Sequence, residues 1–234
     1  MPITSAHNTH LKELRKLSRR RRARELAGRF VAEGEDLLAA ADSAGWNALE
    51  RYCAAGSGLA GTEVEPELLD AVSELGSGTR TLAVYETRWA QRPLGPLCVS
   101  LHGVSDPGNV GTILRSAAAF GAASVAIGPG SADPYGPKAV RASMGSLFRV
   151  PLGAFDAAEG RRVALVPRGG VPLPELAVEG EVVLVLGSER EGLPDDVLAA
   201  CEERASIPQP GGAESLNVAL AGAIALYELA RRGG

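Results

Sequence analysis

Cysteines, aromatic residues and long apolar runs are scarce in this sequence of 234 residues. The three cysteines, Cys53, Cys98 and Cys201, stand far apart with no CxxC pair. They therefore predict core thiols rather than a disulfide framework or a structural zinc site. No run of about 18 uncharged apolar residues exists, and no apolar stretch follows the basic N-terminus, which argues against a membrane span and a signal peptide. We expect a folded, cytoplasmic protein with no membrane attachment.

Charge is distributed unevenly along the chain, although the net charge is only −4. Residues 11–31 hold nine basic and two acidic residues, so this segment carries +7 and the remainder −11. A concentrated basic block suits phosphate neutralisation, because each contact between a cation and a phosphate releases condensed counterions. The alternative is a solvated helix face or a disordered tail. The residues predicted to bind RNA here are Lys12, Arg15, Lys16, Arg19, Arg20, Arg21, Arg22 and Arg24.

The first 90 residues have the pattern of a small α/β unit. Asn8 or Thr9 can cap a helix that carries Leu11, Leu14 and Leu17 on one face and cations on another, and this helix should end or change partner near Arg20. Strands are predicted at 30–31, 48–54 and 81–85, and helices at 33–44 and 67–75.

Two further patterns in this half carry no function. Residues 56–61 match GxGxxG, but the next four residues are β-like or irregular and a helix can start only at Pro66, so no nucleotide site is predicted there. His7 and His10 are at helical spacing, but no further candidate ligands accompany them, so no metal is predicted.

A second unit begins near residue 97, after a segment with prolines and a glycine that we interpret as a linker. Strands are predicted at 97–101, 124–127, 162–166, 182–186 and 204–207, alternating with helices at 110–120, 137–144, 194–201 and 215–231. Continuous apolar strands such as VVLVL predict a parallel sheet that is covered on both faces. In such sheets ligands lie beyond the carboxyl ends of the strands, so the loops there are the place to look for a site.

Three motifs follow strand ends. Residues 106–115 (DPGNVGTILR) place Asn109 at the cap of a predicted helix and Arg115 in its second turn. Residues 184–194 (LVLGSEREGLP) put two glycines around a loop that contains Glu189, and residues 207–218 (IPQPGGAESLNV) place Ser215 as a helix cap and Asn217 in the first turn. Taken singly, these side chains could be an ordinary cap, a surface ion pair and an exposed turn carboxylate.

Together, DPGNVGTILRSAAAFGA, LVLGSEREGLP and IPQPGGAESLNVALAGAIALYEL resemble the three ordered motifs of the SpoU/TrmH family of the SPOUT superfamily. The resemblance covers about residues 97–231. More weakly, RFVAEG at 29–34 is similar to the family's appended RNA-binding domain, which resembles small ribosomal proteins. The resemblance implies an α/β fold class, in which a parallel-sheet SPOUT domain with a C-terminal trefoil knot (97–234) follows a small α/β RNA-binding domain (1–90) and a linker (91–96). It also implies a homodimer through the C-terminal domain, where small residues from Ala219 to Ala225 could admit close contact.

The same resemblance implies S-adenosylmethionine-dependent methylation of a ribose 2′-hydroxyl in RNA. We expect ribosomal RNA, because family members that act on transfer RNA often lack the N-terminal domain. The matching catalytic positions are Asn109, Arg115, Glu189, Ser215 and Asn217. The residues predicted to bind the methyl donor are Leu186, Gly187, Ser188, Glu189, Gly192, Ile207, Gln209, Ser215, Leu216 and Asn217. The chain departs from the family at His102, where relatives often have an acid, and at Gln209, where many have methionine.

A ribose hydroxyl is a poor nucleophile, so the reaction needs a base or stabilisation of the developing charge. An arginine is effectively always protonated, so we predict that Arg115 holds RNA phosphate and stabilises that charge, while Asn109, Ser215 and Asn217 orient ribose and donor. No metal is required. Two alternatives stay open: a non-catalytic protein of RNA binding or ribosome assembly, and the same chemistry on transfer RNA.

Overall fold

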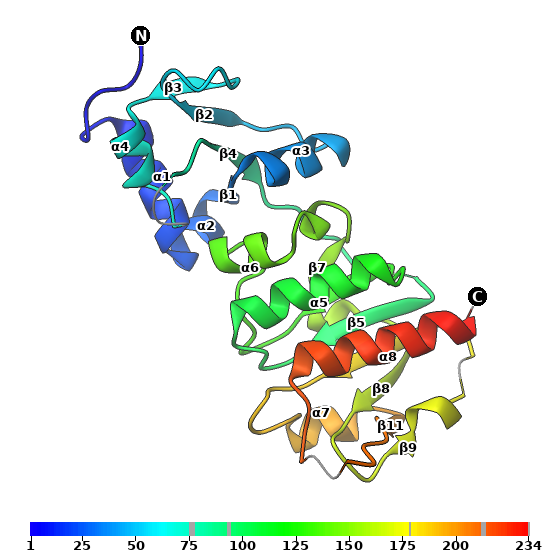
Figure 1. Cartoon of the computed structure of the whole chain (residues 1–234). Coiled ribbons are helices and arrows are strands. Elements are labelled where there is room, and N and C mark those ends of the chain that lie inside the picture. The colour runs from blue at the N-terminus through cyan, green and yellow to red at the C-terminus, as the bar shows by residue number, and fades with distance from the viewer. Residues whose placement is uncertain (75–77, 93–94, 178, 212–213, 234) are drawn as a thin grey trace.

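The computed structural model describes residues 1–74, 78–92, 95–177, 179–211 and 214–233, and these residues form two β-sheets with their own helices (Figure 1). The elements of the first half are α1 (Thr9–Arg19), α2 (Arg21–Ala27), β1 (Arg29–Glu33), α3 (Glu35–Ser43), β2 (Glu50–Ala54), β3 (Thr62–Val64), α4 (Pro66–Asp70) and β4 (Thr81–Glu86). Their sheet has the order β1-β4-β2-β3, in which only β2 and β3 run parallel.

The first helix forms as its pattern predicts. The Asn8 side chain caps α1 by accepting a hydrogen bond from the backbone N–H of His10, and Leu11, Leu14 and Leu17 are buried in a core with strands of the first sheet. The helix ends at Arg19, and Arg20 has extended backbone (φ −124°) before α2 begins. Eight of the nine cations of the basic block therefore lie on two short helices and at Arg20, where the helices join, and Arg29 starts β1.

The GxGxxG segment at 56–61 is a connection between two paired strands. It leads directly into β3, a strand that the sequence pattern did not resolve, and α4 starts at Pro66 as predicted. The helix is shorter than the predicted 67–75, and residue 75 lies outside the described residues.

The second half holds a seven-stranded sheet in which every neighbouring pair is parallel, in the order β7-β6-β5-β10-β8-β11-β9. Its strands are β5 (Leu97–Leu101), β6 (Ser124–Ile127), β7 (Leu152–Ala154), β8 (Arg161–Leu165), β9 (Val171–Pro172), β10 (Val182–Leu186) and β11 (Glu203–Ser206). Its α-helices are α5 (Pro107–Ala119), α6 (Pro137–Ala142), α7 (Asp195–Ala199) and α8 (Val218–Gly233), with 3₁₀ turns at Ser146–Phe148, Phe155–Ala157 and Leu173–Glu175. The parallel α/β class is confirmed, and β7 and β9 are short edge strands that the sequence pattern missed.

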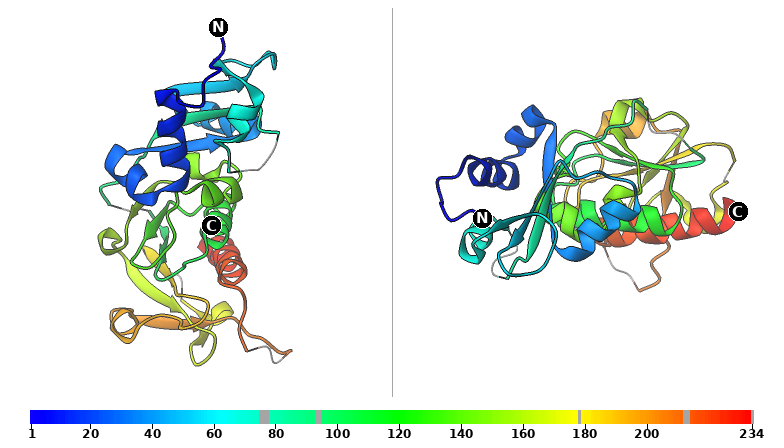
Figure 2. Two further views of the ribbon diagram at one scale, coloured as in Figure 1. Left: turned by 90° about the vertical axis from the view of Figure 1, so that its left-hand side faces the viewer. Right: turned by 90° about the horizontal axis from the view of Figure 1, so that it is seen from above.

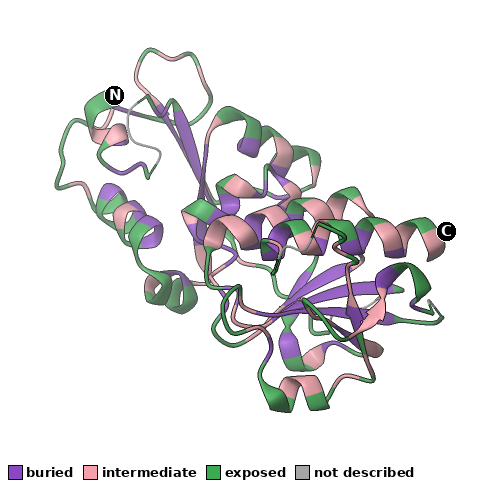
Figure 3. Ribbon diagram, turned by 60° about the horizontal axis from the view of Figure 1, so that its bottom comes forward, coloured by how far each residue is buried: buried purple, intermediate pink, exposed green. Residues whose placement is uncertain are grey.

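Both faces of this sheet are buried, which explains the continuous apolar run in β10. Val182, Leu184 and Leu186 pack in a core under α5 and α8, whereas Val183 and Val185 pack in a second core on the opposite face with residues near α7. Figure 3 shows the central strands buried, strands towards the β9 edge of the sheet only partly buried, and the helices exposed along their outer sides. In Figures 1 and 2, α5 and α8 run side by side on one face of the sheet.

Two helix starts differ from those predicted. Asp106, not Asn109, caps α5, because its side chain accepts a hydrogen bond from the Asn109 backbone N–H at 2.9 Å. The last helix begins at Val218 rather than at Ser215, so Asn217 precedes the helix and occupies the capping position predicted for Ser215. Proline is favoured at the first position of a helix, so α5 starts at Pro107 and not at the predicted residue 110.

The two sheets meet through an aromatic cluster. The chain has only ten aromatic residues, 4% of its length, and five of them lie at this junction. They are Phe30, Trp46, Tyr85, Tyr135 and Phe148. The Trp46 indole also donates to the Phe148 carbonyl at 2.9 Å, so one continuous core crosses from one sheet to the other. Within the described ranges, no helix is long and apolar enough to cross a membrane.

Candidate active site

A cleft opens at the carboxyl ends of β8, β10 and β11. Its walls come from three loops that are far apart in the sequence, which follow these strands, and from the start of α8. Nine of the ten residues predicted to bind the donor line it: Leu186, Gly187, Ser188, Glu189, Gly192, Ile207, Gln209, Ser215 and Leu216. The structure therefore brings the second and third motifs to one place, as expected for ligand loops of a parallel sheet.

The remaining predicted residue, Asn217, connects this cleft to the first motif through a chain of polar contacts. The Asn109 amide donates from Nδ2 to Glu189 Oε1 and accepts at Oδ1 from Asn217 Nδ2, which lies 3.2 Å away. Asn217 Oδ1 accepts in turn from the backbone N–H groups of Ala219 and Leu220 at 3.0 and 3.3 Å. One residue of each motif thus takes part in a single network that the start of α8 anchors.

The loop that carries Glu189 is a tight turn. Ser188 and Gly192 exchange two backbone hydrogen bonds of 2.9 and 3.1 Å, and the Ser188 hydroxyl accepts from the Glu191 N–H. A Cβ on Gly187 would lie 2.5 Å from the carbonyl carbon of Gly192, so only glycine allows this close approach. Gly192 has φ +70°, a conformation that also favours glycine. The two glycines of the motif are therefore required by the shape of the loop.

Arg115 lies apart from the cleft lining. It is exposed on α5, six residues or about 9 Å of helix rise beyond Asn109, and it makes no hydrogen bond or ion pair with the residues that the structure describes. Its guanidinium is free to meet a group that arrives from outside. Ser215 lines the cleft but is exposed, and the neighbouring Gly212 and Ala213 of its motif lie outside the described residues.

The lining of the cleft fits S-adenosylmethionine. Leu165, Leu186, Ile207 and Leu216 offer apolar surface for a flat base, and the glycines allow backbone to approach it. Gln209 contributes a buried Oε1 that has no hydrogen-bond partner among the residues that the structure describes. An unsatisfied buried acceptor is costly, so a donor group from a ligand in the cleft would stabilise it. Gln209 therefore offers a polar contact at this wall of the cleft.

Most cations of the basic block are on the surface of α1 and α2. Lys12, Lys16, Arg20 and Arg22 are exposed and have no ion pair with the described part of the chain, whereas Arg15 donates to the Ala6 carbonyl. Arg19 pairs with Glu74 and Arg21 with Glu25, in contacts that are open to solvent and contribute little to stability.

The prediction that Arg24 binds RNA does not fit the structure. Its side chain is only 7% exposed and forms an ion pair of 2.7 Å with Asp133 of the second half of the chain. Because this guanidinium is buried and already holds Asp133 and the Leu17 carbonyl, we no longer count Arg24 among the cations exposed to RNA phosphate. The count of charges along the sequence did not distinguish Arg24 from its exposed neighbours.

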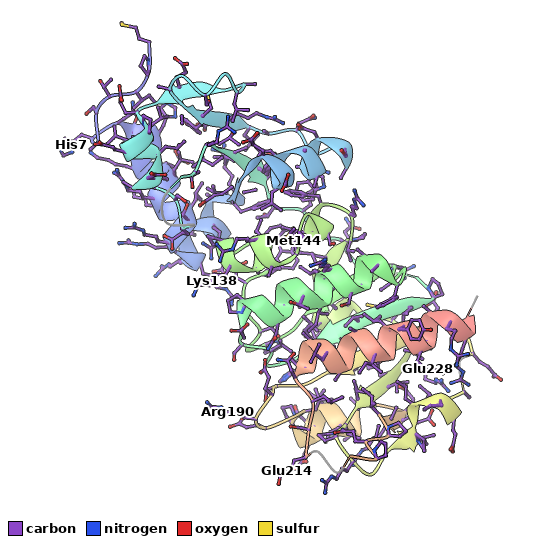
Figure 4. All side chains as sticks on the ribbon, viewed as in Figure 1. His7, Lys138, Met144, Arg190, Glu214 and Glu228 are labelled. Atoms are coloured by element: carbon purple, nitrogen blue, oxygen red, sulfur yellow. The ribbon has the colours of Figure 1, made fainter. Side chains whose placement is uncertain are left out.

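The third wall of the cleft comes from a segment that was not predicted to belong to the site. Leu165, Val166 and Pro167 line it from the end of β8. The sequence does contain an indication of this wall. Pro167 and two glycines follow a predicted strand, just as glycines follow the predicted strands that precede the two recognised loops. Arg190 and Glu214, which belong to the two recognised loops, lie at the same end of the domain in Figure 4.

Comparison with known proteins agrees with this site. Residues 96–227 match the SpoU rRNA Methylase family. An uncharacterized tRNA/rRNA methyltransferase of Synechocystis is 31% identical over 98% of this chain and 93% of its own length. The 23S rRNA (guanosine(2553)-2′-O)-methyltransferase RlmP of Bacillus subtilis is 35% identical over 55% of this chain, which corresponds to 56% of RlmP. Among solved structures, the AdoMet-bound rRNA methyltransferase of Sinorhizobium meliloti superposes with a TM-score of 0.87 at 30% identity, covering 100% of this chain and 98% of that one. The chain therefore belongs to the SpoU rRNA Methylase family.

Proposed function

We propose that this protein transfers a methyl group from S-adenosylmethionine to a ribose 2′-hydroxyl of ribosomal RNA. The observation that carries the proposal is the network of Glu189, Asn109 and Asn217 beside the cleft. A protein that only bound RNA would have no need for a polar residue from each of three motifs to meet at a ligand cleft. The relatives named for 2′-O-methylation of 23S rRNA and for binding AdoMet support the same reaction and donor.

The polar network holds the reacting groups in place. Asn109 is fixed on both sides of its amide, so its second Nδ2 hydrogen keeps a defined direction and can orient the ribose or the donor. When bound, S-adenosylmethionine supplies a methyl group on an electrophilic sulfonium. Arg115, permanently protonated and unpaired within the described residues, binds RNA phosphate and stabilises the negative charge that develops on the ribose oxygen. Positioning of this kind can lower a barrier by roughly 7 to 11 kcal/mol in favourable cases.

We assign RNA binding to the unit formed by residues 1–90, with residues 91–96 as the linker to the methyltransferase domain at 97–234. Ribosomal RNA is favoured because the chain matches relatives over this first half as well as the second. Transfer RNA is the second candidate, since another structural neighbour at 33% identity concerns "2-OH methylation of C/U34 on tRNA", but it covers only 59% of this chain. We also propose that the segment from β11 to α8 threads the trefoil knot implied by the family resemblance.

The function is tested by donor binding and by mapping of methylation. S-adenosylhomocysteine should bind with one site per chain by calorimetry, and Gly187→Ala should abolish this binding because the new Cβ would displace the Ser188–Gly192 turn. Ribosomal RNA from cells with and without the protein should then differ at a 2′-O-methyl mark. Absence of ligand binding by the wild-type protein at millimolar concentration, or identical RNA maps, would reject the assignment.

We further propose a homodimer through α8. Leu220, Ile224 and Tyr227 form an apolar stripe with exposed fractions of 57%, 42% and 54%. Such a stripe is typical of an interaction surface. Three of the small residues that we expected at the contact pack inside the chain instead: Ala219 and Ala225 are buried, and a Cβ on Gly222 would lie 2.9 Å from Leu186 Cδ1, whereas Ala221 and Ala223 are half-buried.

Leu220→Glu together with Ile224→Glu should therefore convert the protein from dimer to monomer in light scattering, because burying unpaired charges in an interface is costly. Leu49→Glu, which changes another half-exposed leucine in the first half of the chain, is the matched control and should leave the mass unchanged. A wild-type protein that scatters as a monomer at micromolar concentration would contradict the proposal.

A further inference from the structure

Helix α2, which carries part of the basic block, is held to the protein by one buried side chain. Arg24 is the only buried residue among its seven. An apolar side chain would normally occupy such a position, because burying a charge requires compensation by a partner. The partner here is Asp133, in the loop between β6 and α6, with a side chain that is 14% exposed. This ion pair is therefore the buried side-chain contact between α2 and the second half of the chain.

The contacts of Arg24 are directional. Its Nε and Nη2 both approach Asp133 Oδ2 at 2.7 Å, while Nη1 donates to the carbonyl of Leu17 at 2.6 Å and approaches that of Ser18 at 3.3 Å. The planar guanidinium thus joins the last turn of α1, helix α2 and the second half of the chain in one fixed geometry. A lysine or an apolar side chain could not make the same set of contacts.

The loop at residues 131–136 receives other contacts from the first half of the chain. Arg21 Nη1 donates to the Ser131 carbonyl at 3.2 Å. Asp133 Oδ1 accepts from the Tyr135 N–H at 2.9 Å, and the Tyr135 hydroxyl donates to the Arg88 carbonyl and accepts from its N–H. Burial raises the pKa of Tyr135, so its hydroxyl keeps the proton that this contact requires. We call residues 131–136 the joint loop.

The joint loop is also connected to the reaction site. Its Ala132 N–H donates to the Val104 carbonyl at 2.8 Å, just before the first motif, and the preceding Pro129 carbonyl accepts from Gly103. Gly103 lies against Ser188 of the cleft. A groove runs beside these contacts, and Arg24 and Asp133 line it together with Pro107, the first residue of α5, and Lys138. Figure 4 shows Lys138 beside α2, at the near end of α6.

We propose that Arg24 and Asp133 are positioning residues that set the distance and direction between the cations of α2 and the reaction site, and that they thereby select which ribose of the bound RNA is methylated. This inference rests on the proposed function. The aromatic cluster and the Tyr135–Arg88 contacts also hold the two halves together, so loss of the ion pair loosens α2 without separating the halves of the chain. RNA then still binds, but the target ribose no longer reaches the cleft in one register.

The test compares three variants. Asp133→Asn keeps the acceptor for Tyr135 but leaves a buried, unpaired arginine. Arg24→Met with Asp133→Asn removes both charges and places an apolar side chain at the buried position 24 of α2. Glu25→Gln, which breaks the exposed Arg21 pair on the same helix, is the matched control. Each is measured for thermal stability, S-adenosylhomocysteine affinity by calorimetry, affinity for deproteinised ribosomal RNA from cells that lack the protein, and the positions and rates of 2′-O-methylation on that RNA.

For the double variant we expect wild-type thermal stability, donor affinity within about twofold, and RNA affinity within about threefold, because the exposed cations are intact. Its kcat at the native ribose should fall by about 100-fold, the effect of a displacement near 1 Å, and methylation should appear at neighbouring riboses. Glu25→Gln should match the wild type in every measurement.

Two outcomes overturn the inference. A stable double variant that methylates the native ribose alone, at the wild-type rate, would show that the ion pair only stabilises the fold. A loss of rate in Asp133→Asn that follows its loss of thermal stability and recovers fully in the double variant would show the same. Failure of the proposed function is distinguishable, because the wild-type protein itself would then neither bind S-adenosylhomocysteine nor methylate this RNA.

Discussion

Replacement of Arg115 with alanine is expected to lower methyl transfer by about 100- to 1,000-fold, the usual cost of removing one charged or hydrogen-bonding group from a transition state. Affinity for S-adenosylhomocysteine should stay within about twofold, because Arg115 does not line the cleft. Thermal stability should also be unchanged, since the side chain is exposed and has no partner in the described part of the chain. Single-turnover rates with saturating RNA and donor, together with calorimetry, provide the measurement.

Arg115→Lys separates charge from shape. A lysine keeps the positive charge but lacks the planar fork that binds phosphate through two parallel hydrogen bonds, so it should restore RNA affinity in part and turnover very little. Arg92→Ala, which removes an exposed arginine paired with Glu159, is the control for a general change of charge. Turnover near the wild-type level in Arg115→Ala would remove this residue from the reaction.

The second large effect is expected from the basic helices. Changing Lys12, Lys16, Arg20 and Arg22 to glutamine removes four exposed charges, while Arg24 and the leucine face of α1 remain intact. If all four meet phosphates, the log-log dependence of RNA affinity on salt should flatten by about 3, at 0.7 to 0.9 for each lost contact. Donor affinity should not change. Filter binding at several salt concentrations measures the slope.

The matched control for these charges is Arg80→Gln with Arg92→Gln, which neutralises exposed arginines that pair with Glu35 and Glu159. It should leave the slope as it is in the wild type. If the four-residue variant remains folded and keeps the wild-type slope and affinity, α1 and α2 do not contact the RNA, and their cations are a solvated surface.

The sequence predicted strands best where they are buried on both faces. β5, β6 and β10 have the predicted bounds. Each is a short run of apolar residues between glycine, proline or polar residues, and this length and these flanking residues favour a buried strand over a helix. Edge strands β3, β7 and β9 were missed, since two or three partly exposed residues carry no periodic signal. Helix starts were less certain for another reason: Asp106 and Asn109 are both good caps, and only the backbone shows which one occupies that position.

The candidate site was predictable as a set of residues, because three motifs at strand ends of one parallel sheet must meet at one edge. Their contacts were not predictable. The network through Asn109 depends on where the loop of Glu189 turns back, and the role of Arg24 depends on Asp133, which is 109 residues away in the sequence. A pattern of charges along a helix contains no information about such a distant partner.

The aromatic cluster between the two sheets has a consequence for how this protein folds and how it can be divided. Because Phe30, Trp46, Tyr85 and Phe148 share one core across the junction, neither half can lose its structure without exposing large apolar surface on the other. The two halves should therefore melt in a single cooperative transition rather than as independent modules. The first half is accordingly a poor candidate for transplantation onto another methyltransferase, because it would carry an unpaired aromatic face into its new context.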